Sequence, residues 1–303
     1  MGIIKTENLT KVYDNVKAVD GIDLTVEKGE VFGFIGPNGA GKTTAIGMMV
    51  GLIEPTAGKC YVKDVDVTHN PLEAKRITGY LPDGVGFYGN LTSRQNLKYF
   101  SRFYGMKDAD ADARITELLK YVGLETVQKP VGSYSRGMKQ RLGLAQALLN
   151  DPEVIFLDEP TNGLDPQGVI QFRKIIKELS KNGKTIFFSS HILEEVRHVC
   201  NNIGIISKGK IVAHGPPDEV RKRMSKDEYV TIIVKTQGDL PKLTDPRIID
   251  AAYDGNSAVL KAKEDIRDSI SEELFRKDFR VRELRLEEKT LEDIFLETLY
   301  GGE

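Results

Sequence analysis

The sequence predicts an α/β protein with a helix-covered parallel sheet, followed by a smaller α+β domain. Two apolar runs, 153–160 and 184–191, have the character of buried strands and are separated by an amphipathic helix over 166–183. A glycine-rich turn joins an apolar strand at 29–36 to a helical stretch at 41–53. Strands that alternate with helices form a parallel sheet, and 303 residues are enough for two cores.

We expect the first domain to span residues 1–220. Apolar positions recur at three- and four-residue spacing through about 90–150, which predicts a helical subdomain. The other predicted elements of this domain are strands at 2–13 and 16–26, helices at 92–105, 110–123 and 137–150, and a strand pair over 201–215 that turns at Lys208-Gly209.

Residues 221–227 are predicted to be a linker, whose basic side chains favour a solvated helix end over a binding patch. Residues 228–303 then form an accessory α+β domain without a catalytic constellation. Its predicted elements are strands at 228–235, 247–254, 257–263 and 279–288, and helices at 264–278 and 291–301. The last helix is predicted to begin after Thr290. One face carries an apolar stripe, which packs against its own domain or, alternatively, forms a dimer contact; its residues are Leu291, Ile294, Phe295 and Leu299.

Composition excludes several classes of function. The chain has 43 basic and 45 acidic side chains, so no overall charge attracts it to nucleic acid. Its two cysteines, Cys60 and Cys200, are far apart in sequence and predict neither a zinc site nor a disulfide, which suits a reducing cytosol. No apolar run reaches the roughly 18 residues that span a bilayer, so we expect any membrane role to come through a partner.

The segment "GPNGAGKT" at 36–43 satisfies the pattern of a phosphate-binding loop, and it follows a strand and opens a helix as that loop must. Its glycines let backbone amides point at phosphates, the lysine neutralises the β- and γ-phosphates, and the first threonine is a hard oxygen ligand for magnesium. A glycine-rich hairpin is the alternative. The predicted nucleotide-binding residues here are Gly36, Asn38, Gly39, Ala40, Gly41, Lys42, Thr43 and Thr44.

Polar side chains end both buried strands. Asp158 and Glu159 follow the first; if catalytic, Asp158 holds the hydration shell of magnesium and Glu159 orients and deprotonates the attacking water. His191 ends the second strand and could bond the γ-phosphate, because parallel strands emerge at one edge. The alternatives are a capped strand end and an ordinary turn histidine.

A second anion-binding feature is the turn "YSRGM", which opens the helix at 137–150 with Ser135 and Gly137 near its positive end. It lies about a hundred residues after the phosphate loop. Another aromatic, Tyr13, sits between two strands, where packing is the favoured interpretation and adenine stacking the alternative.

At these motifs the chain resembles the ATP-binding cassette (ABC) transporter ATPases over roughly residues 3–215. The resemblance implies the ABC cassette form of the P-loop NTPase fold, with a mixed sheet core, an antiparallel β subdomain and a helical subdomain. The motifs that carry it, in order, are Tyr13, "GPNGAGKT", "GYLPD" with Asp83, "YSRGM", "VIFLDEP", "GLDP" with Asp165, and "SSH" with His191.

The resemblance implies an ATPase that uses Mg²⁺ and dimerises head to tail around two ATP. Ser135 and Gly137 then contact the γ-phosphate held by the second copy, Asp165 lies across that interface, and Tyr13 stacks on adenine, contrary to the packing interpretation. The chain departs from the family in "YSRGM", where Leu-Ser-Gly-Gly-Gln is usual, and at Asp83, where a glutamine usually contacts magnesium and senses the transmembrane partner.

These variants and the ending "TLEDIFLETL" resemble the ATPase subunits of type-2 exporters. That resemblance implies export of drugs, lipids, glycans or ions through a separate multi-span permease, at the inner face of the cell membrane. Phe87 and Tyr88 are candidates for contacting the permease, with core packing an equal alternative. The rival functions are a soluble ABC-type ATPase and a nucleotide-gated scaffold, against which Glu159 argues.

Overall fold

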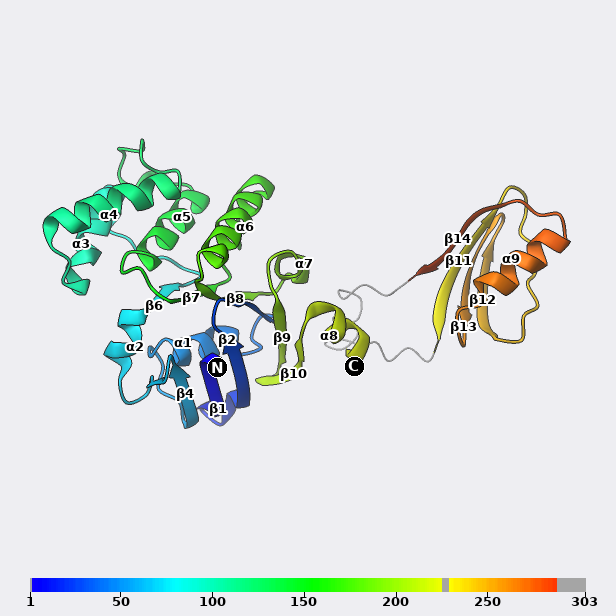
Figure 1. Cartoon of the computed structure of the whole chain (residues 1–303), viewed down its shortest axis with the longest axis horizontal. Coiled ribbons are helices and arrows are strands. Elements are labelled where there is room, and N and C mark those ends of the chain that lie inside the picture. Colours follow the sequence, from blue (N-terminus) through cyan, green and yellow to red (C-terminus); the bar gives the residue numbers. More distant parts are fainter. Residues whose placement is uncertain (1, 225–228, 288–303) are drawn as a thin grey trace. The chain divides into compact units, whose positions relative to one another are not determined.

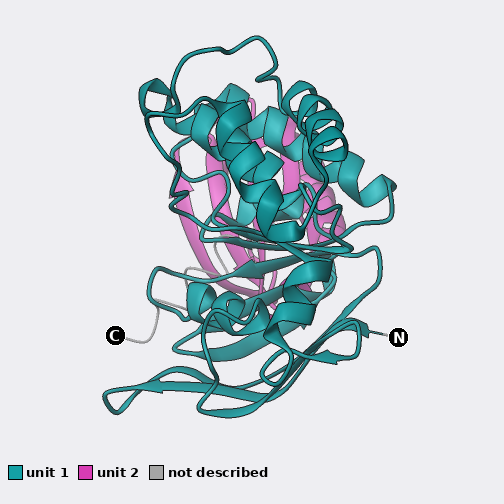
Figure 2. Ribbon diagram, turned by 90° about the vertical axis from the view of Figure 1, so that its left-hand side faces the viewer, with its two compact units in different colours: residues 1–220 teal, residues 221–303 magenta. Residues whose placement is uncertain are grey.

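The computed structural model describes residues 2–224 and 229–287, and the chain divides into two compact units, residues 1–220 and 221–303 (Figures 1 and 2). The boundary between the units falls within helix α8, Pro217–Met224. The first four residues of the predicted 221–227 linker are therefore helical. No helix in the described ranges is long and apolar enough to cross a membrane.

A six-stranded mixed sheet forms the centre of the first unit. Its order is β10-β9-β3-β8-β7-β6, in which only the β9-β10 pair is antiparallel. The strands are β3 Val31–Ile35, β6 Thr78–Leu81, β7 Val154–Asp158, β8 Thr185–Ser190, β9 Asn202–Ser207 and β10 Lys210–Gly215. β3, β7 and β8 are buried along their whole length, as continuous apolar runs predict for a covered parallel sheet.

Strand register brings the predicted functional segments to one edge of this sheet. Ile35 pairs with Ser190, and Asp158 pairs with Ser189. The phosphate loop, the Asp158-Glu159 pair and His191 therefore leave the sheet together at the carboxyl ends of its strands. This position is where open α/β sheets bind their ligands.

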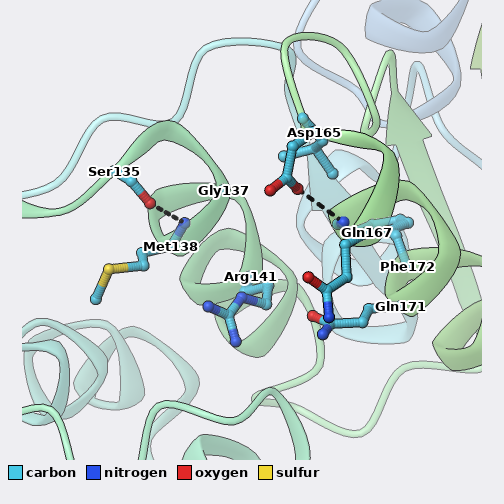
Figure 3. Close-up of a pocket in the computed structure, with 10 residues that line it drawn as sticks. Ser135, Gly137, Met138, Arg141, Asp165, Gln167, Gln171 and Phe172 are labelled. Carbon is cyan, nitrogen blue, oxygen red and sulfur yellow. Dashed lines mark hydrogen bonds between the residues drawn. The ribbon is translucent and has the colours of Figure 1, made fainter.

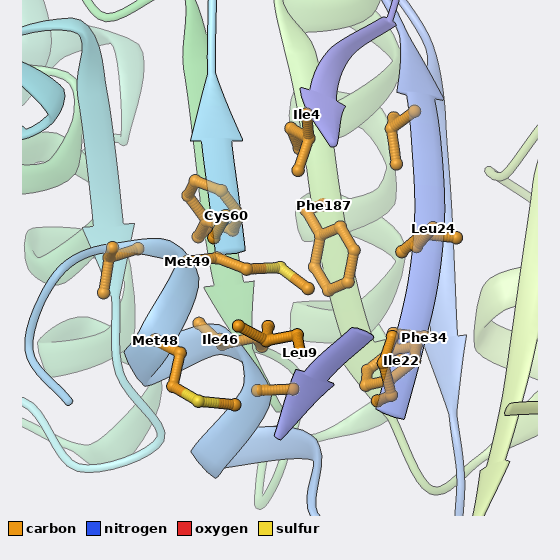
Figure 4. Packing of buried hydrophobic residues seen from close by; sticks show 14 of the residues in the cluster. Ile4, Leu9, Ile22, Leu24, Phe34, Ile46, Met48, Met49, Cys60 and Phe187 are labelled. Carbon is orange, nitrogen blue, oxygen red and sulfur yellow. The ribbon is translucent and has the colours of Figure 1, made fainter. Parts of the chain in front are cut away.

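A second, antiparallel sheet, in the order β2-β1-β4-β5, lies below the first in the view of Figure 1. Helix α1, Lys42–Met49, lies between the two sheets and contacts β7 on one side and β2 and β4 on the other. Figure 4 shows the apolar core at this layer, where Met49 and Phe187 meet side chains of the antiparallel sheet. The strands are β1 Gly2–Tyr13, β2 Val16–Glu27, β4 Ala57–Val62 and β5 Val65–Asp66.

The helical subdomain contains α3 Ser93–Ser101, α4 Asp108–Tyr121 and α5 Arg136–Ala147 (Figure 1). The predicted helix at 92–105 is α-helical only to Ser101 and ends in a single 3₁₀ turn, Arg102–Tyr104. α5 packs against β6 of the central sheet. The remaining helices of the unit are α2 Pro71–Ile77, α6 Pro166–Lys181 and α7 Leu193–Arg197.

The second unit is a four-stranded antiparallel sheet, β12-β13-β11-β14, with helix α9 Arg267–Arg276. Ile270 and Leu274 of α9 are fully buried against the sheet, so one sheet face and one helix face form the core. The predicted helix at 291–301 lies outside the described residues. The strands are β11 Val230–Thr236, β12 Ile248–Asp254, β13 Ser257–Ala262 and β14 Val281–Glu287.

Candidate functional site

The phosphate loop wraps the start of α1 and positions Lys42 at the sheet edge. The Lys42 ammonium donates to the carbonyl oxygens of Gly36 at 2.6 Å and Pro37 at 3.1 Å, and it pairs with Glu159 Oε1 at 3.0 Å. Lys42 is only 5% exposed. A buried cation needs partners for its charge, and here these are the loop's own carbonyl oxygens and the candidate base.

Two glycines of the loop have backbone conformations that other residues rarely adopt. Gly41 has φ +106°, and a Cβ there would lie 2.2 Å from the carbonyl oxygen of Ala18. Gly39 has φ +80° with open space around it, so conformation alone requires the glycine. These glycines let the loop bend, and the loop lines a pocket of about 340 Å³.

The described residues that line this pocket include most of the predicted loop residues. Gly36 and Ala40 lie behind it: a Cβ on Gly36 would come within 2.4 Å of the Ile206 carbonyl oxygen, and the Ala40 carbonyl accepts from the Gly209 amide. The pocket is lined by Ala18, Asn38, Gly39, Gly41, Lys42, Thr43, Thr44, Asp83, Glu159 and Asn162.

The two adjacent acids point in different directions. Asp158 is fully buried and accepts from the Ser189 hydroxyl at 2.6 Å. Glu159 has φ +48°, a left-handed conformation that is uncommon for a residue with a side chain and is typical of functional sites. Its amide donates to the same serine oxygen at 2.9 Å, which holds this turn in place.

His191 is positioned directly on the candidate base. Its Nδ1 lies 2.7 Å from Glu159 Oε2, and its backbone amide donates to the same oxygen at 3.3 Å. Because Nδ1 and the amide face Glu159, Nε2 is the ring nitrogen left for another partner. Strands β7 and β8 thus bring Glu159 and His191 into contact, as expected for parallel strands that end at one edge.

Sequence reasoning missed Glu195, which supports this edge from helix α7. Glu195 is 6% exposed, although it lies in the charged segment "LEEVR". Its Oε2 accepts from the hydroxyls of Thr161 and Ser190, and the Ser190 hydroxyl in turn accepts from the Ile192 amide. The network joins the segment after β7 to the segment after β8.

The structure fits a magnesium ion at Asp158. Within the described part of the chain, the Oδ2 atom of this buried carboxylate makes no hydrogen bond. Burial raises the pKa of Asp158, and the hydroxyls of Ser189 and Thr43 oppose that shift. The described residues contain no group of three or more histidine, cysteine or acidic side chains able to hold a metal. A hard cation here would therefore take oxygens from Asp158, Thr43 and the phosphates.

Asp83 also lines the phosphate-loop pocket. Its Oδ1 accepts from Asn162 Nδ2 at 3.2 Å and lies 3.5 Å from Arg136 Nη2. Arg136 belongs to the "YSRGM" turn, 53 residues further along the chain. Two of the positions at which the sequence departs from the family pattern, Asp83 and Arg136, thus contact each other.

Ser135, Gly137 and Asp165 meet in a second pocket of about 220 Å³, drawn in Figure 3. Ser135 caps α5 by accepting from the Met138 amide at 3.3 Å, and Asp165 caps α6 by accepting from the Gly168 amide at 2.8 Å. Two helix N-termini therefore converge on this pocket, which favours an anion, and Arg141 lines it as well, while the Asp165 carboxylate places one negative charge beside them. Of the described residues, none lines both this pocket and the phosphate-loop pocket.

Tyr13 ends β1 and is 44% exposed. The Lys11 ammonium lies 5.1 Å from its ring centre. Tyr13 is not one of the residues that line the phosphate-loop pocket. Half of its surface is thus open to stack on a flat group, and its role at adenine stays a prediction.

The fold and the phosphate-loop edge define a P-loop ATPase. Residues 19–162 match the ABC transporter family, and residues 215–299 match the C-terminal domain of ATP-binding proteins like DrrA1-3. The bacitracin transport ATP-binding protein BcrA of Bacillus licheniformis is 38% identical over 305 residues, which cover 99% of this chain and 98% of that protein. The linearmycin resistance ATP-binding protein LnrL of Bacillus subtilis is 36% identical, over 77% of this chain and 75% of that protein.

Solved structures of ABC ATP-binding subunits share the fold of this chain. An ATP-binding subunit of an ABC transporter superposes with a TM-score of 0.67 at 29% identity, covering 73% of this chain and 92% of that one. A dimeric, post-hydrolysis ATP-binding cassette, MJ0796 bound to ADP and Pi, has a TM-score of 0.65 at 25% identity, covering 70% and 98%. The chain belongs to the ATP-binding proteins of ABC transporters, and it binds and hydrolyses ATP.

Proposed function

We propose that two copies of this chain close head to tail around two ATP and drive export through a separate membrane permease. The dimer is supported by the separation of the two anion-binding pockets within one chain. The pocket at Ser135 has the geometry for a phosphate but shares no described residue with the loop that holds one. A second copy, facing the opposite way, would supply that phosphate.

Hydrolysis then follows from the residues at the sheet edge. Lys42 and the loop amides hold the triphosphate. Glu159 accepts a proton from a water molecule as the oxygen of that water attacks the γ-phosphorus. The bond from that phosphorus to the β–γ bridging oxygen breaks, and ADP leaves with the electron pair. His191 holds the Glu159 carboxylate in place. Thr43 and Asp158 would hold a magnesium ion, and Asp83 would reach it through a water molecule. The ion would neutralise charge on the phosphates.

Two further roles complete the nucleotide site. Tyr13 would stack on the adenine, for which an exposed ring face is sufficient. Asp165 would lie across the dimer interface beside Ser135, since both line one pocket in the single chain.

A cluster of aromatic side chains on the helical subdomain is the proposed permease contact. The rings of Tyr88, Tyr99 and Phe103 pack edge to face, with centres 5.0 and 5.3 Å apart, and these residues are 48%, 38% and 70% exposed. Phe87, by contrast, is half-buried against Phe100. The structure therefore favours Tyr88 over Phe87 as the contact residue of the pair. Such an apolar surface suits a helix of a membrane subunit, which would hold the chain at the inner face of the membrane.

Sedimentation of the Glu159→Gln variant tests the dimer. This variant retains Lys42 and Ser135 but loses the base, so we expect it to form dimers when Mg-ATP is added. The matched variant, which adds Ser135→Arg, should bind ATP with similar affinity and remain monomeric, because the new side chain fills the second pocket. Equal dimerisation of both variants would contradict the proposal.

Co-purification tests the permease contact. We expect Phe103→Asp to lose its membrane subunit while keeping ATP hydrolysis in solution. Phe275→Asp is the control, because Phe275 is 85% exposed on the second unit and outside the aromatic cluster. Retention of the permease by Phe103→Asp would refute the assignment of this surface.

A further inference from the structure

We propose that Arg136 is a positioning residue that couples the two ATP sites of the dimer through an ion pair with Asp83. The inference rests on the proposed head-to-tail dimer. In that dimer, Asp83 belongs to the pocket that holds the chain's own ATP, whereas the turn containing Arg136 faces the ATP of the second copy.

The contacts of Arg136 reach toward both sites. Its guanidinium lies 3.5 Å from Asp83, whose carboxylate also accepts a hydrogen bond from Asn162. Asp83 and Asn162 both line the phosphate-loop pocket. Arg136 itself follows Ser135, the cap of α5 that lines the second pocket. One side chain thus bridges the wall of one pocket and the turn of the other.

Packing on Gly163 fixes the path of this arginine. A Cβ on Gly163 would lie 2.7 Å from Arg136 Nε and 2.8 Å from its Cδ and Cζ, and Gly163 has φ +72°. Gly163 stands between Asn162, which lines the phosphate-loop pocket, and Leu164, which lines the second pocket. The arginine therefore rests on the segment that joins the two pockets.

The charges give the ion pair its function. A triphosphate that binds in the phosphate-loop pocket places negative charge near Asp83. Because like charges repel, the Asp83 carboxylate moves away from Arg136 and the ion pair weakens. The freed guanidinium stays beside Ser135, where it can form charge-assisted bonds to a phosphate of the second copy. Binding of one ATP then favours binding of the other, and the effect is reciprocal.

Both partners are about half exposed, at 54% and 49%, so the coupling is modest. In the Glu159→Gln background, we expect Arg136→Gly to raise the ATP concentration for half-maximal dimerisation about two- to fivefold, ~0.4–1 kcal/mol, and Asp83→Gln, which leaves the guanidinium permanently free, to lower it by a similar factor. The double variant should match Arg136→Gly, because without the guanidinium the change at Asp83 has nothing to release. High salt should remove the difference from the parent protein.

Sedimentation velocity across an ATP titration measures these values. Lys98→Ala is the control, since it removes an ion pair of 2.9 Å with Asp112 elsewhere in the helical subdomain and should change little.

Three results would overturn the inference. Effects of the single variants that multiply in the double variant would show that Arg136 and Asp83 act independently. Single variants equal to the parent would show that the pair has no role. Failure of the Glu159→Gln parent to dimerise at all would refute the dimer as well, whereas dimerisation with multiplying effects refutes only the coupling.

Discussion

Removal of the His191 side chain should slow hydrolysis without weakening ATP binding. In His191→Ala, Glu159 loses the Nδ1 contact at 2.7 Å and retains only the backbone amide at 3.3 Å. A hydrogen bond to a charged group contributes about 1.5–3 kcal/mol, and the 37% exposed imidazole places this one toward the lower end. The expected loss in kcat is therefore about tenfold to thirtyfold, with KM within about twofold.

Steady-state phosphate release against ATP concentration separates kcat from KM. His191→Gln, which keeps a hydrogen-bond donor, should recover part of the rate. In a Glu159→Gln background, loss of His191 should have little further effect, because the histidine acts through that carboxylate. The same loss in both backgrounds, or a higher KM with unchanged kcat, would refute the positioning role.

Three other changes test the site and the second unit. Gly41→Ala should weaken ATP binding at least tenfold and lower Tm, because its Cβ would meet the Ala18 carbonyl at 2.2 Å; isothermal titration and thermal unfolding measure both. Asp158→Asn should abolish magnesium-dependent hydrolysis yet raise Tm at neutral pH. Burial raises the pKa of Asp158, so its ionised form costs stability above that pKa, and the gain should fade as pH falls through it. Asp245→Asn should destabilise the second unit. Its bond from Arg247 lowers the pKa of Asp245, so that stability is present above the usual carboxyl pKa and lost in acid, which urea melts across pH can follow.

Local sequence pattern was sufficient for the phosphate loop and the buried strands. The runs at β7 and β8 are continuous and apolar, and the common edge of parallel strands brought Glu159 and His191 together. By contrast, residues 57–81 carried no clear pattern. Half of the β4 residues there are exposed, and the strand forms by pairing with β1 about fifty residues earlier, a partner that local periodicity does not reveal.

The missed features of the site depend on tertiary contacts. Glu195 has the sequence context of a solvated helix, yet Thr161 and Ser190 bury and satisfy it. The contact between Arg136 and Asp83 joins positions 53 residues apart, in segments with no shared pattern. The turn at Glu159 requires a left-handed residue where nothing in "LDEP" signals one.

Complementation between two inactive variants tests the shared site most directly. Lys42→Ala damages a chain's own phosphate loop, and Ser135→Arg damages only what that chain offers its partner. Each alone should hydrolyse ATP poorly, whereas an equal mixture should regain activity, because only a mixed dimer contains one intact site. A mixture no more active than its parents would contradict the account.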